Sequence, residues 1–265
     1  MRVKNIASGS SGNVTLVGSN NTNILVDCGI SCKRINAALK EEGMALEDID
    51  AIIITHEHID HISGLGVIER KYNIPVYATA GTLAGIRQIK SLGEFDEGLL
   101  NPISAQKNFN VGDINIMAYN IFHDANEPVC YRMENNSSSF AIVTDLGEYD
   151  DRLINAMHGL DGILLEANHD VRMLEAGPYP YQLKRRILGK YGHLSNESSG
   201  RLLASLLHDN IKYIMLGHLS RENNTRELAK LAVETEIALA DNTYRPEDFD
   251  ILVARRDQPS EMTQL

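Results

Sequence analysis

The residues best suited to chemistry lie in one run of six, His-Glu-His-Ile-Asp-His at positions 56–61. His56 and His58 are two residues apart, so in an extended segment their side chains point to the same side. Asp60 and His61 follow as the chain turns into the next helix, which lets them face a second ion. Imidazole nitrogen and carboxylate oxygen suit Zn, Fe and Mn. A solvated loop with chance histidines fits this spacing poorly, so the cluster predicts a metal site.

Other ligands are expected elsewhere, because a cluster of four ligands cannot complete two metal sites. His123, Asp145 and His218 each come directly after an apolar run. Ligands in α/β sheets converge at the C-terminal ends of strands. Taken singly, each has an ordinary explanation, a surface histidine or, for Asp145, a turn former. As a set placed identically on three strands, they are predicted to be ligands.

The elements that must position these residues are short strands alternating with helices. Runs rich in Ile, Val and Leu are typical of buried strands in a sheet covered by helices. These runs are residues 22–27, 51–55, 114–118, 139–144, 162–165 and 212–216. The helical patterns are residues 31–42, 64–72, 83–91, 151–157, 195–207 and 225–234. The last two begin with Ser or Thr, which are suitable N-caps. The alternation predicts an α/β protein.

The domain organisation follows from what separates these elements. No linker rich in Gly, Pro or Ser divides the 265 residues, so we predict a single domain over 1–265. Residues 135–138 are polar and are expected to form a turn between two strands. The polar tail, residues 255–265, is expected to fray.

Composition and charge indicate the binding partners and the cellular compartment to expect. The formal net charge of −11 argues against unspecific binding of nucleic acid through bulk charge. Two bound divalent cations would still present local positive charge to a phosphate. The odd, low number of cysteines (Cys28, Cys32 and Cys130) fits reduced thiols in a reducing compartment. Residues 1–13 lack the apolar core of a secretory signal, and no apolar stretch approaches the roughly 20 residues of a membrane span. We therefore expect a cytoplasmic protein with no membrane partner.

The order of the candidate ligands resembles that of the metallo-β-lactamase superfamily. The pattern is H-x-H-x-D-H, then His123, then Asp145 in Thr-Asp-Leu-Gly, then His218, and it spans most of the chain. The resemblance implies an αββα sandwich with two divalent metals, which could be Zn, Mn or Fe. By this analogy one metal is held by His56, His58 and His123, the other by Asp60, His61 and His218, and Asp145 bridges them.

An earlier acid also matches the superfamily. Asp27, in Leu-Val-Asp-Cys-Gly, resembles the aspartate at the end of an early strand that supports the metal ligands from behind. A turn acid before Gly29 explains Asp27 nearly as well.

Two later motifs resemble the tRNA-maturing nuclease RNase Z. Leu-Leu-Glu-Ala-Asn-His (164–169) is similar to its Glu-Ala loop, and Gly-His-Leu-Ser-Asn (192–196) to its His-Ser loop, which opens a helix. Carried over, His193 touches the scissile phosphate or protonates the leaving oxygen, and Glu166 orients His193. Alternatively, Ser195 is only an N-cap and His193 only packs in a loop. The long tRNA-gripping arm of RNase Z has no counterpart here.

A closer resemblance, covering nearly the whole chain, is to the YycJ/WalJ family. It is carried by segments such as Ala-Ser-Gly-Ser-Ser-Gly-Asn (7–13), Phe-His-Asp-Ala-Asn-Glu-Pro (122–128) and Gly-His-Leu-Ser-Arg-Glu-Asn-Asn (217–224). The family resembles nucleases, and a double-stranded DNA 5′-to-3′ exonuclease activity is attributed to its members. The resemblance therefore implies DNA as the substrate.

Residues that would grip DNA are less sharply indicated. The candidates for substrate contact are His193, Ser195, Ser11 and Asn13, although a β-turn explains the last two almost as well. A small basic cluster would hold a phosphate backbone without reading sequence, and a solvated helix face explains it equally well. This cluster is Lys184, Arg185, Arg186 and Lys190.

The predicted function is a metal-dependent phosphodiesterase, a DNA exonuclease in which two metals share an attacking hydroxide. Asp60 would accept a proton or aim the hydroxide, and His193 would assist the departing oxygen. The alternative is a hydrolase of a small ester, thioester, lactone or cyclic phosphodiester, which the acidic charge mildly favours. The complete ligand set argues against a binding protein with an inactive site. Metal identity, DNA versus RNA, polarity, exo- versus endonuclease action and oligomeric state stay open.

Overall fold

The computed structural model describes residues 1–136 and 138–265, which form two compact units. Unit 1 comprises Met1–Asn120, Ala125–Ser137 and Arg255–Gln264, and unit 2 comprises Ile121–Asp124, Ser138–Ala254 and Leu265. The prediction of one domain stays a prediction, because two compact units can belong to one domain.

Unit 1 contains a seven-stranded sheet in the order β14-β1-β2-β3-β4-β5-β6. Neighbours from β14 to β3 are antiparallel, and those from β3 to β6 are parallel. Its strands are β1 (Arg2–Ala7), β2 (Val14–Gly18), β3 (Asn23–Val26), β4 (Ala51–Ile53), β5 (Val76–Thr79), β6 (Leu100–Ile103) and β14 (Thr263–Gln264). Parallel neighbours require crossover connections, and helices occupy them.

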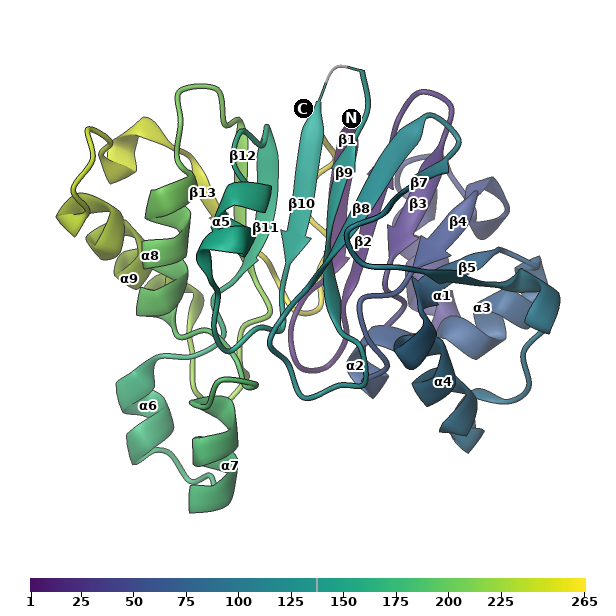
Figure 1. Ribbon diagram of the computed structural model, residues 1–265, viewed down its shortest axis with the longest axis horizontal. Helices are drawn as coiled ribbons and strands as arrows, with labels where there is room; N and C mark the ends of the chain where they lie inside the picture. The colour runs from purple at the N-terminus through teal and green to yellow at the C-terminus, as the bar shows by residue number, and fades with distance from the viewer. Residues whose placement is uncertain (137) are drawn as a thin grey trace. The chain divides into compact units, whose positions relative to one another are not determined.

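Three crossover helices of unit 1 lie together beside this sheet (Figure 1). They are α1 (Cys32–Lys40), α3 (Leu65–Tyr72) and α4 (Ala80–Gln88). Their apolar residues join those of the strands in one buried cluster, to which Ile35, Ile68 and Ile86 each contribute from a different helix. This packing fixes the sheet edge from which the His-Glu-His-Ile-Asp-His segment leaves. Unit 1 also holds three antiparallel strands, β7 (Asn108–Val111), β8 (Ile114–Asn120) and β9 (Val129–Glu134).

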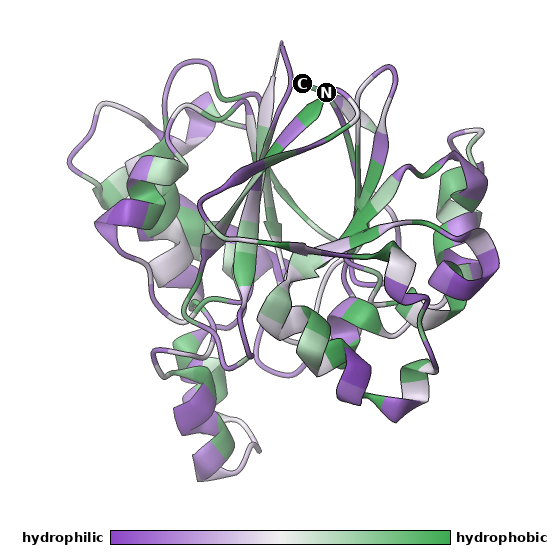
Figure 2. Cartoon of the chain, turned by 45° about the vertical axis from the view of Figure 1, so that its right-hand side comes forward, coloured by the Kyte–Doolittle hydropathy of each residue, from purple (hydrophilic) through white to green (hydrophobic). Residues whose placement is uncertain are grey.

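Unit 2 is built on four parallel strands in the order β13-β12-β11-β10. They are β10 (Ser139–Val143), β11 (Gly162–Glu166), β12 (Tyr213–Gly217) and β13 (Ile251–Val253). Every residue of β10, β11 and β12 is buried, as expected of parallel strands covered on both faces. Figure 2 shows hydrophobic residues along the strands, with hydrophilic residues concentrated on outer turns and loops.

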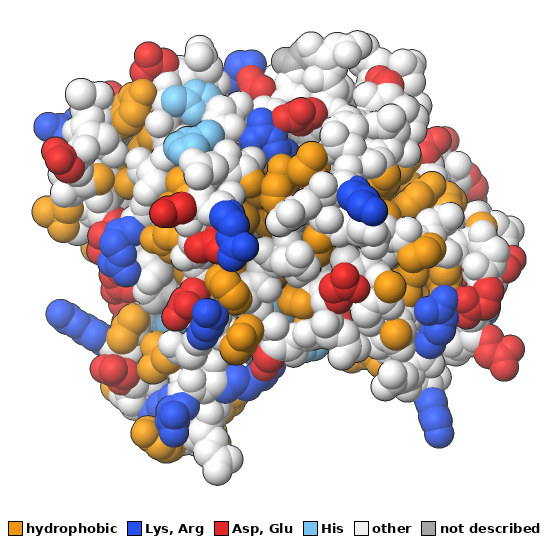
Figure 3. Space-filling view, viewed as in Figure 1, with side chains coloured by type: hydrophobic (Ala, Val, Ile, Leu, Met, Phe, Trp, Pro, Cys, Tyr) orange, Lys and Arg blue, Asp and Glu red, His pale blue; other side chains and the backbone are white. Residues whose placement is uncertain are grey.

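The helices of unit 2 form two groups. The first, α5 (Asp151–Ala156), α8 (Asn196–Leu206) and α9 (Arg226–Leu239), lies beside the sheet (Figure 1). The second, α6 (Val171–Ala176) and α7 (Tyr181–Ile187), extends away from the sheet of its unit (Figure 1). Lys, Arg and hydrophobic side chains are interspersed over this second group in the lower left of Figure 3.

The predicted α/β alternation is confirmed, and all six predicted strands and six predicted helices are present with shifted ends. Ser195 and Thr225 are N-caps as expected, and each side chain accepts a hydrogen bond from the backbone N–H three residues later. Helix α4 begins three residues before the predicted start because Thr79 caps it. The short helices α2 (Ile59–Ile62), α6 and α7 escaped prediction, because fewer than two helical turns show no apolar period.

The polar tail does not fray, so that expectation was wrong. Strand β14 pairs with β1 in the register Arg2 to Gln264 and Val3 to Thr263, and Ser260 N–H donates to the Asn5 carbonyl at 2.8 Å. These backbone hydrogen bonds hold the tail against β1 although most of its side chains are polar. The turn expected at 135–138 includes residue 137, which lies outside the described residues. Among the residues described, no helix has the length and apolar character needed to cross a membrane.

Substitution of one buried and one exposed leucine tests which helix faces pack in the core. Leu203 in α8 is fully buried, whereas Leu231 in α9 is 61% exposed. We expect Leu203→Ala to lower the free energy of unfolding by about 2–5 kcal/mol, because it removes apolar contacts and leaves a cavity. Leu231→Ala, the same change in another helix, should alter it by less than about 0.5 kcal/mol. Urea unfolding followed by circular dichroism measures both, and equal losses would contradict the packing described.

Candidate metal centre and active-site residues

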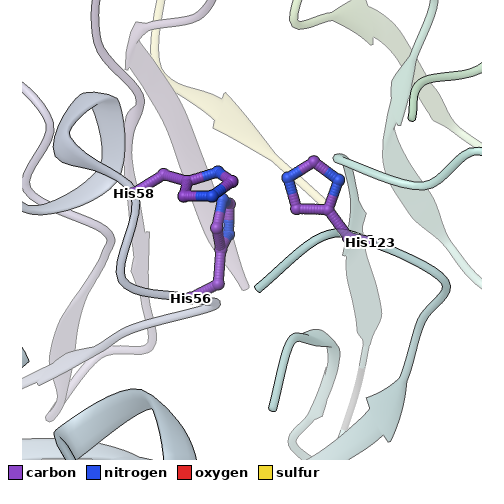
Figure 4. A group of neighbouring side chains, drawn as sticks. All are labelled: His56, His58 and His123. Atoms are coloured by element: carbon purple, nitrogen blue, oxygen red, sulfur yellow. The ribbon is translucent and has the colours of Figure 1, made fainter. Parts of the chain in front are cut away.

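In unit 1, the cluster after β4 gathers three histidine rings. His58 is the N-cap residue of α2, so the chain turns into a helix as expected. The ring centroid of His56 lies 4.6 Å from that of His58 and 4.1 Å from that of His61. His56 and His61 are fully buried, whereas 25% of the Asp60 side chain is exposed. Figure 4 shows the rings of His56 and His58 on this loop, and His123 on the segment after β8.

Asp27 fixes the orientation of His61 from the end of β3. Its Oδ1 accepts from the Thr55 N–H at 2.9 Å, and its Oδ2 lies 2.8 Å from His61 Nδ1. A carboxylate accepts only, so Nδ1 of His61 carries the proton and Nε2 keeps its lone pair. This is the tautomer that a metal-binding histidine needs, and the contact is the one expected of a residue that supports ligands.

Thr55 is a functional residue that the sequence analysis missed. Its Oγ1 lies 2.9 Å from Asp27 Oδ2, 3.0 Å from His56 Nδ1 and 3.2 Å from His61 Nδ1. One hydroxyl therefore contacts the supporting acid and both buried histidines. Its position directly before His56 is the only sequence signal, and a strand residue there would ordinarily be taken as part of the sheet.

Asn13 and Ser11, both predicted to contact substrate, have different environments in the loop after β1. Asn13 is buried, and its Nδ2 lies 3.0 Å from His61 Nε2 and 3.3 Å from the Asp60 carbonyl. Its backbone N–H also donates to that carbonyl, at 2.8 Å. Ser11 is exposed. Asn13 thus holds the segment of candidate ligands in place, and substrate contact by either residue stays a prediction.

In unit 2, the candidates meet at one sheet edge as predicted. Asp145 and His218 follow β10 and β12, and Glu166 ends β11, where it pairs in register with Gly217. Ligand atoms of these three residues and of His193 all lie within 4.8 Å of one another. Asp145 Oδ1 is 3.3 Å from His218 Nε2, 3.7 Å from His193 Nδ1 and 3.9 Å from His123 Nε2. Buried imidazoles and carboxylates at this spacing fit a divalent transition metal.

Glu166 organises this group through both of its oxygens. Oε1 lies 2.8 Å from His193 Nδ1 and 3.1 Å from His218 Nδ1. Oε2 accepts from the backbone N–H of Leu146 at 3.0 Å and of Leu194 at 3.3 Å. The expected contact with His193 is present, and the contact with His218 is an addition. Both rings therefore direct Nε2 away from Glu166.

The charge of Glu166 follows from its neighbours. Burial by itself raises the pKa of this carboxyl, but the adjacent His193 and the hydrogen bonds from His193 and His218 outweigh burial and lower the pKa to about 2. Glu166 is therefore an anion at neutral pH. Because an anion only accepts, the Nδ1 atoms of both histidines carry protons.

Backbone conformation also marks the strand ends. Asp27, Asp145 and His218 have φ angles of 60°, 63° and 55°, which are uncommon for residues with a side chain. A conformation of this kind costs about 1–3 kcal/mol and persists where its surroundings hold it. Asn168, another residue that sequence analysis missed, does so for His218, since its Nδ2 donates to the His218 carbonyl at 2.9 Å.

His123 is held within unit 2 by the segment around α7. Its Nδ1 lies 3.2 Å from the Gly192 carbonyl. The next residue, Asp124, forms an ion pair with Arg186, whose Nη2 donates to Oδ1 at 3.0 Å. Arg186, which the sequence placed in a basic cluster, thus positions the segment that carries a candidate ligand.

His193 is more exposed than the two candidate metal ligands His123 and His218 of unit 2. Its side chain is 17% exposed, against 1% for His123 and 2% for His218. Ser195, two residues later, accepts at Oγ from the Ser198 N–H at 3.2 Å and caps α8. The ordinary explanation for Ser195 is therefore present in the structure. Among these three histidines, His193 combines a ring anchored on Glu166 with access to solvent.

The three cysteines are free thiols. Cys28 is buried, and burial raises its pKa well above the usual range, so it stays protonated. A protonated thiol is neither a nucleophile nor a metal ligand.

The family model described as a beta-lactamase superfamily domain matches residues 22–218. The chain belongs to the metallo-β-lactamase superfamily. Within it, the chain is 42% identical over 236 residues to Exodeoxyribonuclease WalJ of Streptococcus pneumoniae serotype 2 (strain D39 / NCTC 7466), covering 89% of this chain and 88% of WalJ. It is 40% identical over 228 residues to Exodeoxyribonuclease YycJ of Bacillus anthracis, covering 86% of each.

Solved structures of the superfamily share the fold. The metallo-β-lactamase fold protein YhfI from Bacillus subtilis superposes with a TM-score of 0.71 at 16% identity, covering 98% of this chain and 99% of YhfI. The short form of human tRNase Z gives a TM-score of 0.66 at 14% identity, covering all of both chains. The predicted metallo-β-lactamase αββα fold is confirmed. This chain is a metal-dependent hydrolase, and the fold of the superfamily implies divalent metal cofactors.

Replacing Glu166 by Gln tests its role in setting the histidine protons. The amide has one acceptor oxygen for four donors, so donors at His193 and His218 lose their acceptor and the Nδ1–H tautomer is no longer favoured. In the metal-free protein, ¹⁵N NMR should show both rings as Nδ1–H in the wild type and a shift away from it in Glu166→Gln. Stability should fall by about 1–3 kcal/mol for each buried donor left unpaired. Glu175→Gln, at an exposed acid of α6, is the control, and unchanged ring spectra in Glu166→Gln would show that Glu166 does not set the tautomers.

Proposed function

We propose that this chain is an exonuclease that degrades double-stranded DNA from the 5′ end with two divalent metals. Relatives named exodeoxyribonucleases, 40% and 42% identical over most of the chain, support the nucleic-acid substrate. The observation that carries the mechanism is His193, which is partly exposed and hydrogen-bonded to the buried Glu166 anion beside Asp145.

We propose histidine and aspartate side chains as the metal ligands. A buried histidine whose Nδ1 is fixed by a neighbouring acid directs Nε2 away from that acid, as at His218. At His61 a metal would replace the Asn13 amide, which lies 3.0 Å from Nε2. When bound, the metals would supply an activated water and positive charge against the phosphoryl oxygens. The proposed set is His56, His58, Asp60, His61, His123, Asp145 and His218.

Proton handling is assigned to two residues that solvent reaches. Asp60, with a quarter of its side chain exposed, accepts the proton of the attacking water. An imidazolium at His193 gives its Nε2 proton to the departing oxygen, while its Nδ1–H continues to donate a hydrogen bond to Glu166. Glu166 is thus a positioning residue, and His193 is the general acid.

The first experiment is an exonuclease assay on linear duplex DNA labelled at its 5′ ends, with Mn²⁺ or Zn²⁺ supplied. We expect mononucleotide-sized labelled products from the wild type, none after chelation, and recovery when metal is restored. His58→Ala and Asp60→Ala should lose activity, and His58→Ala should also bind less metal by mass spectrometry. His158→Ala, at an exposed histidine, is the matched control. Wild-type protein that binds metal yet leaves DNA intact while hydrolysing small esters would reassign the site to a small-molecule hydrolase.

His193→Ala separates a general acid from a metal ligand. Loss of the proton donor should lower kcat by about 10²–10⁴-fold, because the leaving oxygen departs unprotonated. Metal content should stay at the wild-type value, since the proposed ligands are intact. The deficit should shrink for a substrate with a 4-nitrophenolate leaving group, which needs no proton. A variant that loses metal along with activity would make His193 a ligand instead.

A further inference from the structure

The segment containing α6 and α7 is basic, whereas the chain as a whole is acidic. Residues 171–191 hold five basic residues and one acidic residue, whereas the whole chain has a net charge of −11. Figure 2 shows hydrophilic and hydrophobic residues alternating over these two helices. A local basic segment on an acidic protein attracts anions and therefore indicates a binding surface for one.

The same segment exposes large apolar side chains. Tyr181 is 74% exposed, Tyr191 55% and Leu188 45%, and they are three of the eight large hydrophobic residues exposed among those described. Tyr181, Arg185 and Leu188 are spaced four and three residues apart, so they share one face of α7. Aromatic and basic side chains gathered in this way favour nucleic acid, because bases stack on the rings while cations meet phosphates. We use the name α7 face for Tyr181 and Arg185 of α7, its C-cap residue Leu188, and Lys190 and Tyr191 of the following turn, which both pack against Phe122.

Contacts separate structural cations from available ones. Arg186 is committed to Asp124, and Lys184 Nζ donates to the Glu175 carbonyl at 2.7 Å, which ties α7 to α6. Arg185 instead lies over the Tyr181 ring, 6.0 Å from its centroid. Lys190 lies 4.2 Å over the Phe122 ring and forms an ion pair with the exposed Glu148 at 3.7 Å, and 45% of its side chain is exposed. Arg185 and Lys190 are therefore the cations of this segment that lie beside aromatic rings, and Lys190 would exchange the exposed Glu148 for a phosphate.

The α7 face is rigidly connected to the proposed general acid. The His193 N–H donates to the Ile187 carbonyl of α7 at 3.0 Å, and the Gly192 N–H donates to the Gly189 carbonyl at 2.8 Å. His193 therefore lies at a fixed distance from the face, with no free linker between them. A strand held on this face is held beside the group that protonates the leaving oxygen.

We propose that the α7 face binds one unpaired strand of the DNA substrate, with phosphates on Arg185 and Lys190 and bases stacked on Tyr181 and Tyr191. The strand is single because aromatic rings stack only on bases that are free of their neighbours. This inference rests on the proposed nuclease function and deepens it by assigning how the substrate strand is gripped. Without base-specific contacts, the face binds any sequence.

The test is binding of a fluorescent single-stranded oligonucleotide to the full chain without metal, measured by anisotropy. Arg185→Glu and Tyr181→Ala should each weaken binding about tenfold or more, and Tyr181→Phe should restore it because the ring is kept. Arg185→Ala should lower the slope of log affinity against log salt by about 0.7, the value for one lost phosphate contact on a single strand. Lys107→Glu, the same charge change at an exposed lysine between β6 and β7, is the control.

Each outcome is decisive. Wild-type affinity in Arg185→Glu and Tyr181→Ala, with DNA cleavage intact, overturns the α7 face and leaves the nuclease proposal standing. If the wild type binds the strand, the two variants bind it more weakly, and the wild type cleaves no DNA with metal, the α7 face is supported and the nuclease proposal is overturned. A concentration-dependent dimer that Tyr181→Ala dissociates, without strand binding, overturns the proposal in favour of a second copy of the chain.

Discussion

A buried carboxylate that accepts four hydrogen bonds is the interaction on which unit 2 depends. Glu166 fixes the rings of His193 and His218 with one oxygen and the backbone of Leu146 and Leu194 with the other. A buried anion is costly unless such donors surround it, and here they lower its pKa to about 2. One charge thereby sets the position and the proton of both rings.

In unit 1, Asp27 orients a histidine as Glu166 does in unit 2, with a shorter side chain. Asp27 receives the Thr55 N–H on one oxygen and His61 Nδ1 on the other, and Thr55 Oγ1 extends the contacts to His56. In both units the acid lies at the end of a parallel strand and contacts a histidine that is almost completely buried, His61 in unit 1 and His218 in unit 2. The side chains expected to meet substrate or water, Asp60 and His193, are the more exposed ones.

Sequence reasoning found what depends on local pattern and missed what depends on tertiary contacts. Residues at the ends of apolar runs, such as Asp145 and His218, could be named because parallel strands bring their carboxyl ends to one edge. Thr55 and Asn168 could not, because a hydroxyl or an amide has many ordinary roles and only its partners reveal this one. Helices α6 and α7 were missed for a different reason, since short helices with little buried surface carry no apolar period.

The hydrogen bonds of Glu166 join residues that are 20, 27, 28 and 52 positions apart in the chain. None is local, so none forms until β10, β11 and β12 have paired and the segment before α8 has closed over them. Contacts of high sequence separation form late, since the loops between them must first be closed. A partly unfolded chain therefore has these residues in its sequence but lacks the arrangement of His193 and His218 around Glu166. For the proposed nuclease, the group that protonates the leaving oxygen would therefore exist only in the folded chain.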